Sequence, residues 1–308
     1  MTAPKPALVL VVVCMLLVSH AAITRAMADG WEASAGAIFL NRDAHYDGYL
    51  VVDNGHNPLL SSSDFETGVQ GGFLATLSKD LHDSYSVQAR YFAIDDWSET
   101  DSTATTNGAW LFHGATLGSA TITQIDGTFT SNLNSIEVNL GHQHNDWIKC
   151  LAGFRYLSID ESLHFDFFDG MIDYSDYEGS VNNDLYGVQA GAEVLLLDRG
   201  GPLTVDGIFR AGIYRNEASY DGVYANGMSA QVVDSASQTA FVGEIGINAN
   251  LLLTDNVEFN AGYNMLWVSG ISLLEEQLAA ANWMAGTGIN TDGSAFYHGA
   301  SATFTIYH

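Results

Sequence analysis

The feature that most constrains the fold is a pair of alternating segments joined by a short turn. In residues 241–251 every second position is apolar or glycine, and the positions between them include Glu244 and Asn248. A Thr-Asp-Asn turn follows at 254–256, and the alternation resumes at 257–267. A period of two places one kind of residue on each face of a strand. Because Thr, Asp and Asn favour turns, the region predicts a β-hairpin with one apolar face.

The N-terminus has the pattern of a secretory signal peptide. Lys5 precedes an apolar run at 7–18, and small residues lead to an Ala-Met-Ala sequence ending at residue 28. The run is too short for a spanning helix, although an N-terminal membrane anchor is the alternative. We expect residues 1–28 to be removed, leaving 29–308 as a single domain. Cys150 is then the only cysteine, so the mature chain has no intramolecular disulfide.

The composition favours a barrel that faces lipid. Hydrophobic residues make up 47% of the chain, charged residues only 15%, and there are 31 glycines but 4 prolines. No segment beyond the signal peptide is long enough for a transmembrane helix, and closed barrels are the other structures that satisfy all backbone groups in a bilayer. The net charge of -26 argues against nucleic acid or an anionic lipid surface as a partner.

Alternating segments recur along the whole mature chain, and their spacing predicts ten strands, with twelve as the alternative. The predicted strands are 31–41, 65–78, 85–94, 133–142, 147–159, 185–197, 203–214, 241–253, 257–267 and 295–308. Short and long connections alternate between them, and both termini lie on the side of the short turns. This is the pattern of an all-β, antiparallel, up-and-down barrel of the bacterial outer membrane, with short periplasmic turns and long external loops. A short helix is expected within 272–282, in the last long segment.

The second, mixed face of the strands carries charged side chains that we expect to line the lumen. They are Glu32, Glu66, Arg90, Glu137, Lys149, Arg155, Glu193, Asp206, Arg210, Glu244 and Glu258. Every strand cation falls on this face, as expected if the other face meets lipid, where a cation costs about 2–4 kcal/mol at mid-bilayer. In a ten-stranded barrel these groups either fill a nearly closed lumen or line a narrow path for small cations.

Aromatic residues at the strand ends predict two girdles at the membrane interfaces. The periplasmic set is Trp31, Tyr85 and Trp147, and the outer set is Phe39, Phe65, Tyr156, Tyr186 and Trp267.

Most of the 36 acidic residues fall in the long segments that we expect outside the membrane. The densest group, Asp166, Asp169, Asp173, Asp176 and Glu178, is a weak candidate for Ca²⁺, which prefers several oxygen ligands. His45 and His164 each have aspartates nearby and could form Asp-His dyads, but such pairs arise by chance in an acidic chain. We therefore expect no cofactor and no enzymatic activity.

Several segments together resemble the β-barrel porin family that is seventh in its series. They are 30–42, 153–161, 186–191 and 241–270, and the similarity extends over nearly all of the mature chain. The resemblance implies an exported outer-membrane barrel of undetermined substrate and brings no catalytic residues. This chain departs from the pattern at its end, where His308 follows Tyr307 instead of a terminal aromatic residue.

These observations lead to two functional hypotheses. The first is a monomeric, narrow porin-like channel for small, cationic solutes, with outer-membrane lipids around it and divalent cations at its external loops. The alternative is a non-conducting structural or surface-interaction barrel, with a plugged lumen and functional acidic loops.

Overall fold

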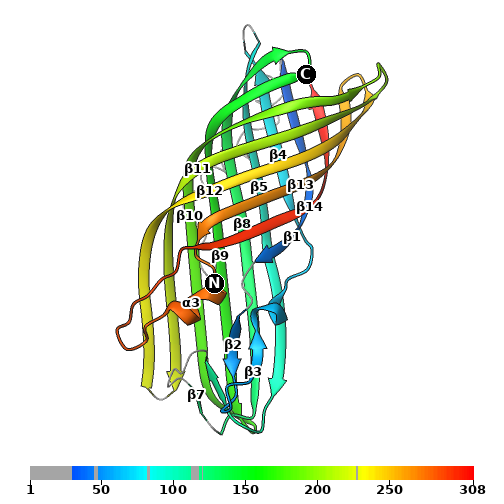
Figure 1. Ribbon diagram of the computed structural model, residues 1–308. Helices are drawn as coiled ribbons and strands as arrows, with labels where there is room; N and C mark the ends of the chain where they lie inside the picture. The colour runs from blue at the N-terminus through cyan, green and yellow to red at the C-terminus, as the bar shows by residue number, and fades with distance from the viewer. Residues whose placement is uncertain (1–29, 45–47, 82–83, 112–117, 120, 227) are drawn as a thin grey trace, which may run out of the picture.

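The chain folds into a closed antiparallel barrel (Figure 1). The computed structural model describes residues 30–44, 48–81, 84–111, 118–119, 121–226 and 228–308, so the predicted signal peptide lies outside the described residues. The barrel strands are β1 (Trp31–Ala44), β4 (Gln70–Asp80), β5 (Tyr85–Ala104), β8 (Gln124–Asn145), β9 (Ile148–Asp169), β10 (Ile172–Asp198), β11 (Leu203–Asn226), β12 (Met228–Thr254), β13 (Val257–Ile271) and β14 (Gly293–Tyr307). Each pairs with its neighbour, and β1 closes the ring by pairing with both β14 and β4. The predicted all-β barrel with ten strands is confirmed in the described part of the chain.

The two ends of the barrel differ in their connections. Short turns follow β4, β8, β10 and β12 at one end, which we call the turn end. Both chain ends of the barrel meet there, since the His308 N–H donates to the Trp31 carbonyl over 3.0 Å. The opposite end, the hairpin end, carries a four-stranded sheet of β2 (Tyr49–Val52), β3 (Pro58–Ser61), β6 (Ala109–Leu111) and β7 (Gly118–Ser119), together with η1 (Ser62–Phe65) and α3 (Leu274–Ala280).

Three segments that the sequence assigns to long loops are largely strand. The strands β9 and β10 continue to a tight turn at 170–171, β11 and β12 pair until Asn226 and Met228, and β5 pairs with β8 as far as Ala104 and Gln124. The expectation of long loops over 160–184 and 215–238, and over 95–104, was therefore wrong. Within the remaining connection, the alternation of residues 120–129 predicts an extension of the hairpin, and β8 confirms it from Gln124 onward. The reason lies in the sequence pattern, which keeps its period of two in these segments but reverses which face is apolar.

The reversal is clear on β9. Its outward positions change from Phe154 and Tyr156 to Asp160 and Ser162, while its inward positions change from Arg155 to buried Leu163 and Phe165. The neighbouring strands β8, β10 and β11 change at the same level. The half of the barrel near the turn end therefore has an apolar belt outside and polar groups inside, and the half near the hairpin end is polar outside and apolar inside. Such a belt is the outer face of a barrel that spans a bilayer.

Two apolar cores fill the barrel interior on the hairpin-end side of its inward polar groups. The lower core, nearer the turn end, contains Ile38, Leu40, Leu74, Phe92, Ile94, Trp97, Leu133, Leu157, Ile159, Leu185, Tyr214, Ala240, Val242, Leu266, Val268, Ile271, Leu273, Ala295 and Tyr297. The upper core contains aromatic residues of the extended hairpins, including Phe129, Phe165, Phe167, Tyr177 and Tyr220. Helix α3 contributes Leu274 and Leu278 to it, so the predicted helix within 272–282 forms and caps this core.

The predicted aromatic girdles are largely on the outer surface. Tyr85, Phe39, Tyr186 and Trp267 are exposed on the outer face, whereas Trp147 lines a cavity inside the turn end of the barrel. Phe65 is the exception, because it belongs to η1 and is buried against Phe165 in the upper core. The strand expected from residue 65 starts only at Gln70. Neither helix in the described part of the chain is long and apolar enough to cross a membrane.

The apolar belt predicts different effects for the same substitution at two points of one strand. Val188→Arg places a cation in the belt and is expected to lower the free energy of unfolding in lipid by about 2–4 kcal/mol. Ser180→Arg, on the same face of β10 beyond the belt, is expected to change it by no more than about 0.5 kcal/mol. Urea titration in lipid vesicles, followed by tryptophan fluorescence, measures both, and equal losses would contradict a belt that ends between these residues.

Candidate functional site

The central feature of the lumen is a cross-linked set of charges, the ionic network of Arg90, Glu137, Arg155, Glu193, Arg210 and Glu244. The register places Arg90, Glu137 and Arg155 directly opposite one another on β5, β8 and β9. It also places Arg210 opposite Glu244 on β11 and β12. Since these residues share the inward parity of their strands, the period of two alone brings opposite charges together on the inner wall.

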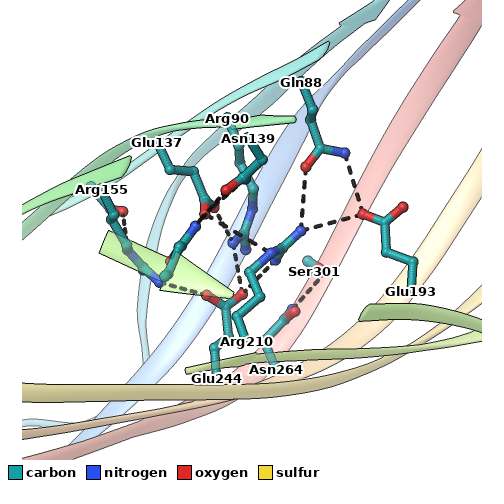
Figure 2. A network of polar contacts seen from close by, with 12 residues as sticks. Gln88, Arg90, Glu137, Asn139, Arg155, Glu193, Arg210, Glu244, Asn264 and Ser301 are labelled. Carbon is teal, nitrogen blue, oxygen red and sulfur yellow. Dashed lines mark hydrogen bonds and ion pairs between the residues drawn. The ribbon is translucent and has the colours of Figure 1, made fainter. Parts of the chain in front are cut away.

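Glu244 joins the two sides of the lumen (Figure 2). One of its carboxylate oxygens accepts from Arg90 Nη1 at 2.7 Å and from Arg210 Nη1 at 3.3 Å, and the other accepts from Arg155 Nη1 at 2.8 Å. Glu244 is on β12 and Arg155 on β9, and two strands, β11 and β10, lie between them; β8, which carries Glu137, lies beyond β9. These ion pairs therefore run across the barrel as well as along its wall.

The network continues through Glu137 and Glu193. Glu137 accepts from Arg90 Nη1 at 2.9 Å and from the Gln189 amide, and Glu193 lies 3.4 Å from Arg210 Nη2. The three guanidinium groups are matched by three carboxylates, and all of these side chains except that of Glu193 are at most 8% exposed. Buried charges are tolerated when they are paired and hydrogen-bonded in this way. The arrangement can close the lumen without leaving a large uncompensated charge.

Glycine makes room for this packing at β10. Gly191 lies opposite Arg210, and a Cβ at this position would lie 2.3 Å from the Phe209 carbonyl oxygen and 3.0 Å from Arg210 Cγ. Any side chain at residue 191 would therefore collide with the neighbouring strand and crowd Arg210.

A second buried charge cluster, the α3 cluster, lies between the two apolar cores. Arg42 of β1 forms ion pairs with Glu161 of β9 and with Glu275 of α3, the latter at 3.4 Å. The other oxygen of Glu161 accepts from the Leu274 N–H at 2.9 Å, so the barrel wall holds the start of α3 directly. Asn183 reinforces the attachment by exchanging two hydrogen bonds of 2.8 Å with the Ser272 backbone.

The remaining charged lumen residues line a cavity of about 400 Å³ at the turn end. Glu32, Asp206 and Glu258 reach it from β1, β11 and β13, and Lys149 lies 3.6 Å from Glu193 at its side. Asn250 donates to Asp206, and Glu258 accepts from Asn260 at 2.6 Å and from the Tyr307 hydroxyl at 3.0 Å. The predicted lumen residues thus form two groups, one that closes the lumen and one that lines this cavity.

Several sequence candidates lie elsewhere. Glu66 follows η1 and is exposed, because the strand predicted to carry it starts four residues later. The five residues of the weak Ca²⁺ candidate do not converge: register pairs Asp166 with Asp176, whereas Asp169 and Asp173 lie at the turn. The described residues hold no group of three or more His, Cys, Asp or Glu side chains that could bind a metal ion.

Of the two proposed Asp-His dyads, one lies in the described residues. His164 Nε2 and Asp166 Oδ1 are 3.0 Å apart on the open outer wall of β9. His45 lies outside the described residues, and Asp43 is 3.3 Å from His298.

Sequence reasoning missed the polar residues that complete the ionic network. Gln88, Asn139, Gln189 and Tyr214 all bond to its members or to one another. The alternation in the sequence places these residues on the inward face of their strands, but because they are uncharged nothing distinguished them from other polar residues there. Arg42 and Glu161 were assigned to external loops, although the alternation of Glu161 with buried apolar residues could have shown that they face inward.

Comparison with known proteins identifies the fold. No family model and no curated protein matches the sequence, so the resemblance to the seventh β-barrel porin family stays an expectation. Among solved structures, the outer membrane protease OmpT of Escherichia coli aligns with a TM-score of 0.56 at 10% identity, over 91% of this chain and 97% of that one. The translocator domain of the autotransporter NalP of Neisseria meningitidis aligns with a TM-score of 0.42 at 11% identity, over 97% and 96%. The fold is that of the bacterial outer-membrane β-barrels.

Removing one charge from the ionic network is expected to be costly. Glu244→Gln leaves three buried guanidinium groups with one carboxylate fewer, which lowers the free energy of unfolding by about 3–5 kcal/mol. The matched control, Glu258→Gln at the cavity, is expected to cost less than about 1 kcal/mol, because an amide oxygen still accepts from Asn260 and Tyr307. Urea titration in lipid measures both, and similar losses would contradict a special cost of breaking the buried network.

The raised pKa of Glu276, on α3 beside the α3 cluster, predicts that attachment of α3 to the barrel depends on pH. Burial, and repulsion from Glu275, Glu161 and Asp292, raise the pKa of Glu276 from 4.5 to about 7. The Glu276 carboxyl therefore binds a proton more tightly when α3 is attached than when it is detached. The free energy that this protonation contributes to attachment is fully present below pH 4.5 and is lost as the pH rises through about 7.

Hydrogen exchange of the amides at 274–280 measures this effect. Their protection factors are expected to fall between about pH 5 and about pH 8, and Glu276→Gln is expected to reduce that fall. Part of it remains, because burial also raises the pKa of Glu161, which accepts from the Leu274 N–H. Glu217→Gln, on the exposed wall of β11, serves as the control. A fall of equal size in the Glu276→Gln variant would exclude this carboxyl as the cause.

Proposed function

We propose that the chain is an outer-membrane barrel with a closed lumen, whose hairpin end works at the cell surface by binding a partner. This is the second of the two hypotheses drawn from the sequence, and it is favoured over the cation channel. The observation that carries the proposal is the ionic network across the lumen with the lower core stacked directly beyond it. A conducting path would have to pass both layers.

The two layers oppose ion flow for different reasons. In the ionic network, Arg155 and Glu244 are almost fully buried and hold each other at 2.8 Å, so an ion would have to replace strong, charge-assisted contacts. In the lower core, fully buried aliphatic side chains such as Leu157, Ile159 and Leu185 offer an ion no polar ligand. The turn-end cavity is then a water-filled recess on the periplasmic side, and the ionic network closes its inner end.

The orientation follows the general pattern of such barrels. The short turns and both chain ends face the periplasm, the apolar belt contacts the outer-membrane lipids, and the hairpins project outward. We propose that the barrel acts as a monomer, since its ring is closed within one chain and needs no strand from a second copy.

The projecting hairpins support a binding role rather than catalysis. Their outer walls are polar and acidic, and their inner faces pack into the upper core, which makes them a rigid extension of the barrel. The His164–Asp166 pair lies on this wall with side chains that are 45% and 38% exposed, rather than in a cleft that excludes water. We propose no enzymatic turnover for the chain.

Planar-bilayer recording of the refolded mature chain in a salt gradient tests the proposal. The expected result is the absence of current steps from protein that heat-dependent gel mobility shows to be folded and inserted, because both layers of the lumen are closed. A known porin refolded in the same lipid is the positive control. Discrete steps with a cation-biased reversal potential would overturn the closed barrel and favour the channel.

A further inference from the structure

The strand β12 extends beyond its neighbour on one side. Its pairing with β13 ends at Phe241 and Ser269, whereas its pairing with β11 continues to Met228. Residues 230–238 therefore have a hydrogen-bonded strand on one side only, and we call this stretch the β12 edge. Figure 1 shows β12 as the last strand of the projecting sheet, with the segment that carries α3 passing near its middle. An edge of this kind presents unpaired backbone donors and acceptors.

The alternation of a strand identifies the backbone groups that point away from β11. Val233 donates its N–H to the Gly286 carbonyl over 3.3 Å, so Val233 faces the open side. Because successive residues point to opposite sides, Gln231, Ser235 and Ser237 face the same way. Ser235 donates to the Asp234 side chain at 2.8 Å. In the described part of the chain, Val233 is the only residue of the β12 edge with a backbone hydrogen bond to a segment other than β11.

The β12 edge lacks most of the features that protect exposed edges. Residues 230–238 contain no proline, lysine or arginine. Their register with β11 has no shift, so no bulge twists the strand away. The single charged residue, Asp234, points inward and accepts from the Gly288 N–H at 2.7 Å, which fixes the covering turn at one point. Away from this turn the edge stays open to pairing, and a strand added over all of residues 230–238 would displace the turn from Val233 and Asp234.

The chemistry of the edge and its surroundings specifies what would bind. Evenly spaced backbone donors and acceptors match another extended chain, which adds as a strand. A hollow of about 450 Å³, lined by Ser219, Asp221, Val233 and Ser235 among others, lies over β10, β11 and β12, and long side chains of the added strand can extend across β12 toward it. Arg215 of β11 is paired with Glu217 at 3.2 Å and also donates to the Ser237 hydroxyl at 3.0 Å, and the whole chain carries a net charge of -26. Complementarity therefore favours a basic strand.

We propose that residues 230–238 of β12 bind an extended, basic peptide segment of a partner protein as an added β-strand. The inference rests on the proposed function, since it names the kind of partner that a surface-binding barrel would take. The backbone of the edge would provide affinity. Asp221 would select lysine or arginine, and the small serine side chains would leave space for other residues.

The probe is a fluorescently labelled, amidated peptide in which valine and threonine alternate with lysine, long enough to cover residues 230–238. The refolded full-length mature chain is expected to bind it, measured by fluorescence anisotropy, with new hydrogen-exchange protection confined to the β12 edge. The same peptide with alternate backbone nitrogens methylated is expected not to bind, because it loses the donors that pair with the edge. Replacing its lysines by glutamines is expected to weaken binding.

Two variants at one position separate edge pairing from other binding. Ser237→Pro removes a backbone N–H that points away from β11, so the barrel is expected to fold, as heat-dependent gel mobility checks. It is expected to weaken peptide binding by about tenfold or more, because the donor is lost and the ring blocks pairing. Ser237→Ala keeps the backbone donor and is expected to bind like the native chain.

The outcomes distinguish the two proposals. Failure of the native chain to bind the peptide, equal binding of the methylated peptide, or equal binding by Ser237→Pro and Ser237→Ala would overturn the added strand. A barrel that is silent in the bilayer but does not bind the peptide would leave the closed-lumen function standing. Current steps in the bilayer would overturn that function, whatever the peptide does.

Discussion

A ring of ten strands encloses so little space that its inward side chains must pack against one another, and the rest of this structure depends on that constraint. Because the outer face of the belt is apolar, the polar residues of each strand point inward and meet there. Charges confined in this way must neutralise one another. Arg90, Arg155 and Arg210 do so with Glu137, Glu193 and Glu244, and the same contacts that neutralise the charge close the lumen.

The reversal of polarity allows one continuous strand to serve two solvents. Near the turn end the apolar face of β9 or β10 is turned outward, and beyond the belt it is turned inward, with no break in the hydrogen-bonded ladder. The projecting hairpins can then bury Phe129, Phe165 and Tyr177 in a core of their own, as a water-soluble domain does. This packing makes the hairpin end a rigid surface rather than a set of loops, and it leaves the β12 edge held in a fixed, extended form.

The sequence predicts the belt half of the barrel well, because there the period of two coincides with a single environment. Strand number, the inward position of the four strand cations and the short helix at α3 all follow from local pattern. The hairpin-end halves of the strands were missed, because the many acidic residues there were interpreted as a sign of loops. The alternating apolar positions among them, such as Leu163, Phe165 and Phe167, were overlooked. Which charges meet across the lumen could not be predicted, since the pairing of Glu244 with Arg90 and Arg155 depends on closure of the whole ring.

A buried ionic network is a poor source of stability compared with apolar side chains of the same volume, because each charge loses its hydration. Its value here lies in fixing the register of the strands. If β5 or β9 slipped by one residue against β8, its own cation, Arg90 or Arg155, would turn toward lipid. Each cation moved in this way costs about 2–4 kcal/mol at mid-bilayer. A slip of two residues would restore the parity but would separate the opposite charges and leave them buried without partners. We infer that the network excludes both errors, so that the charges which close the lumen also determine how the barrel closes.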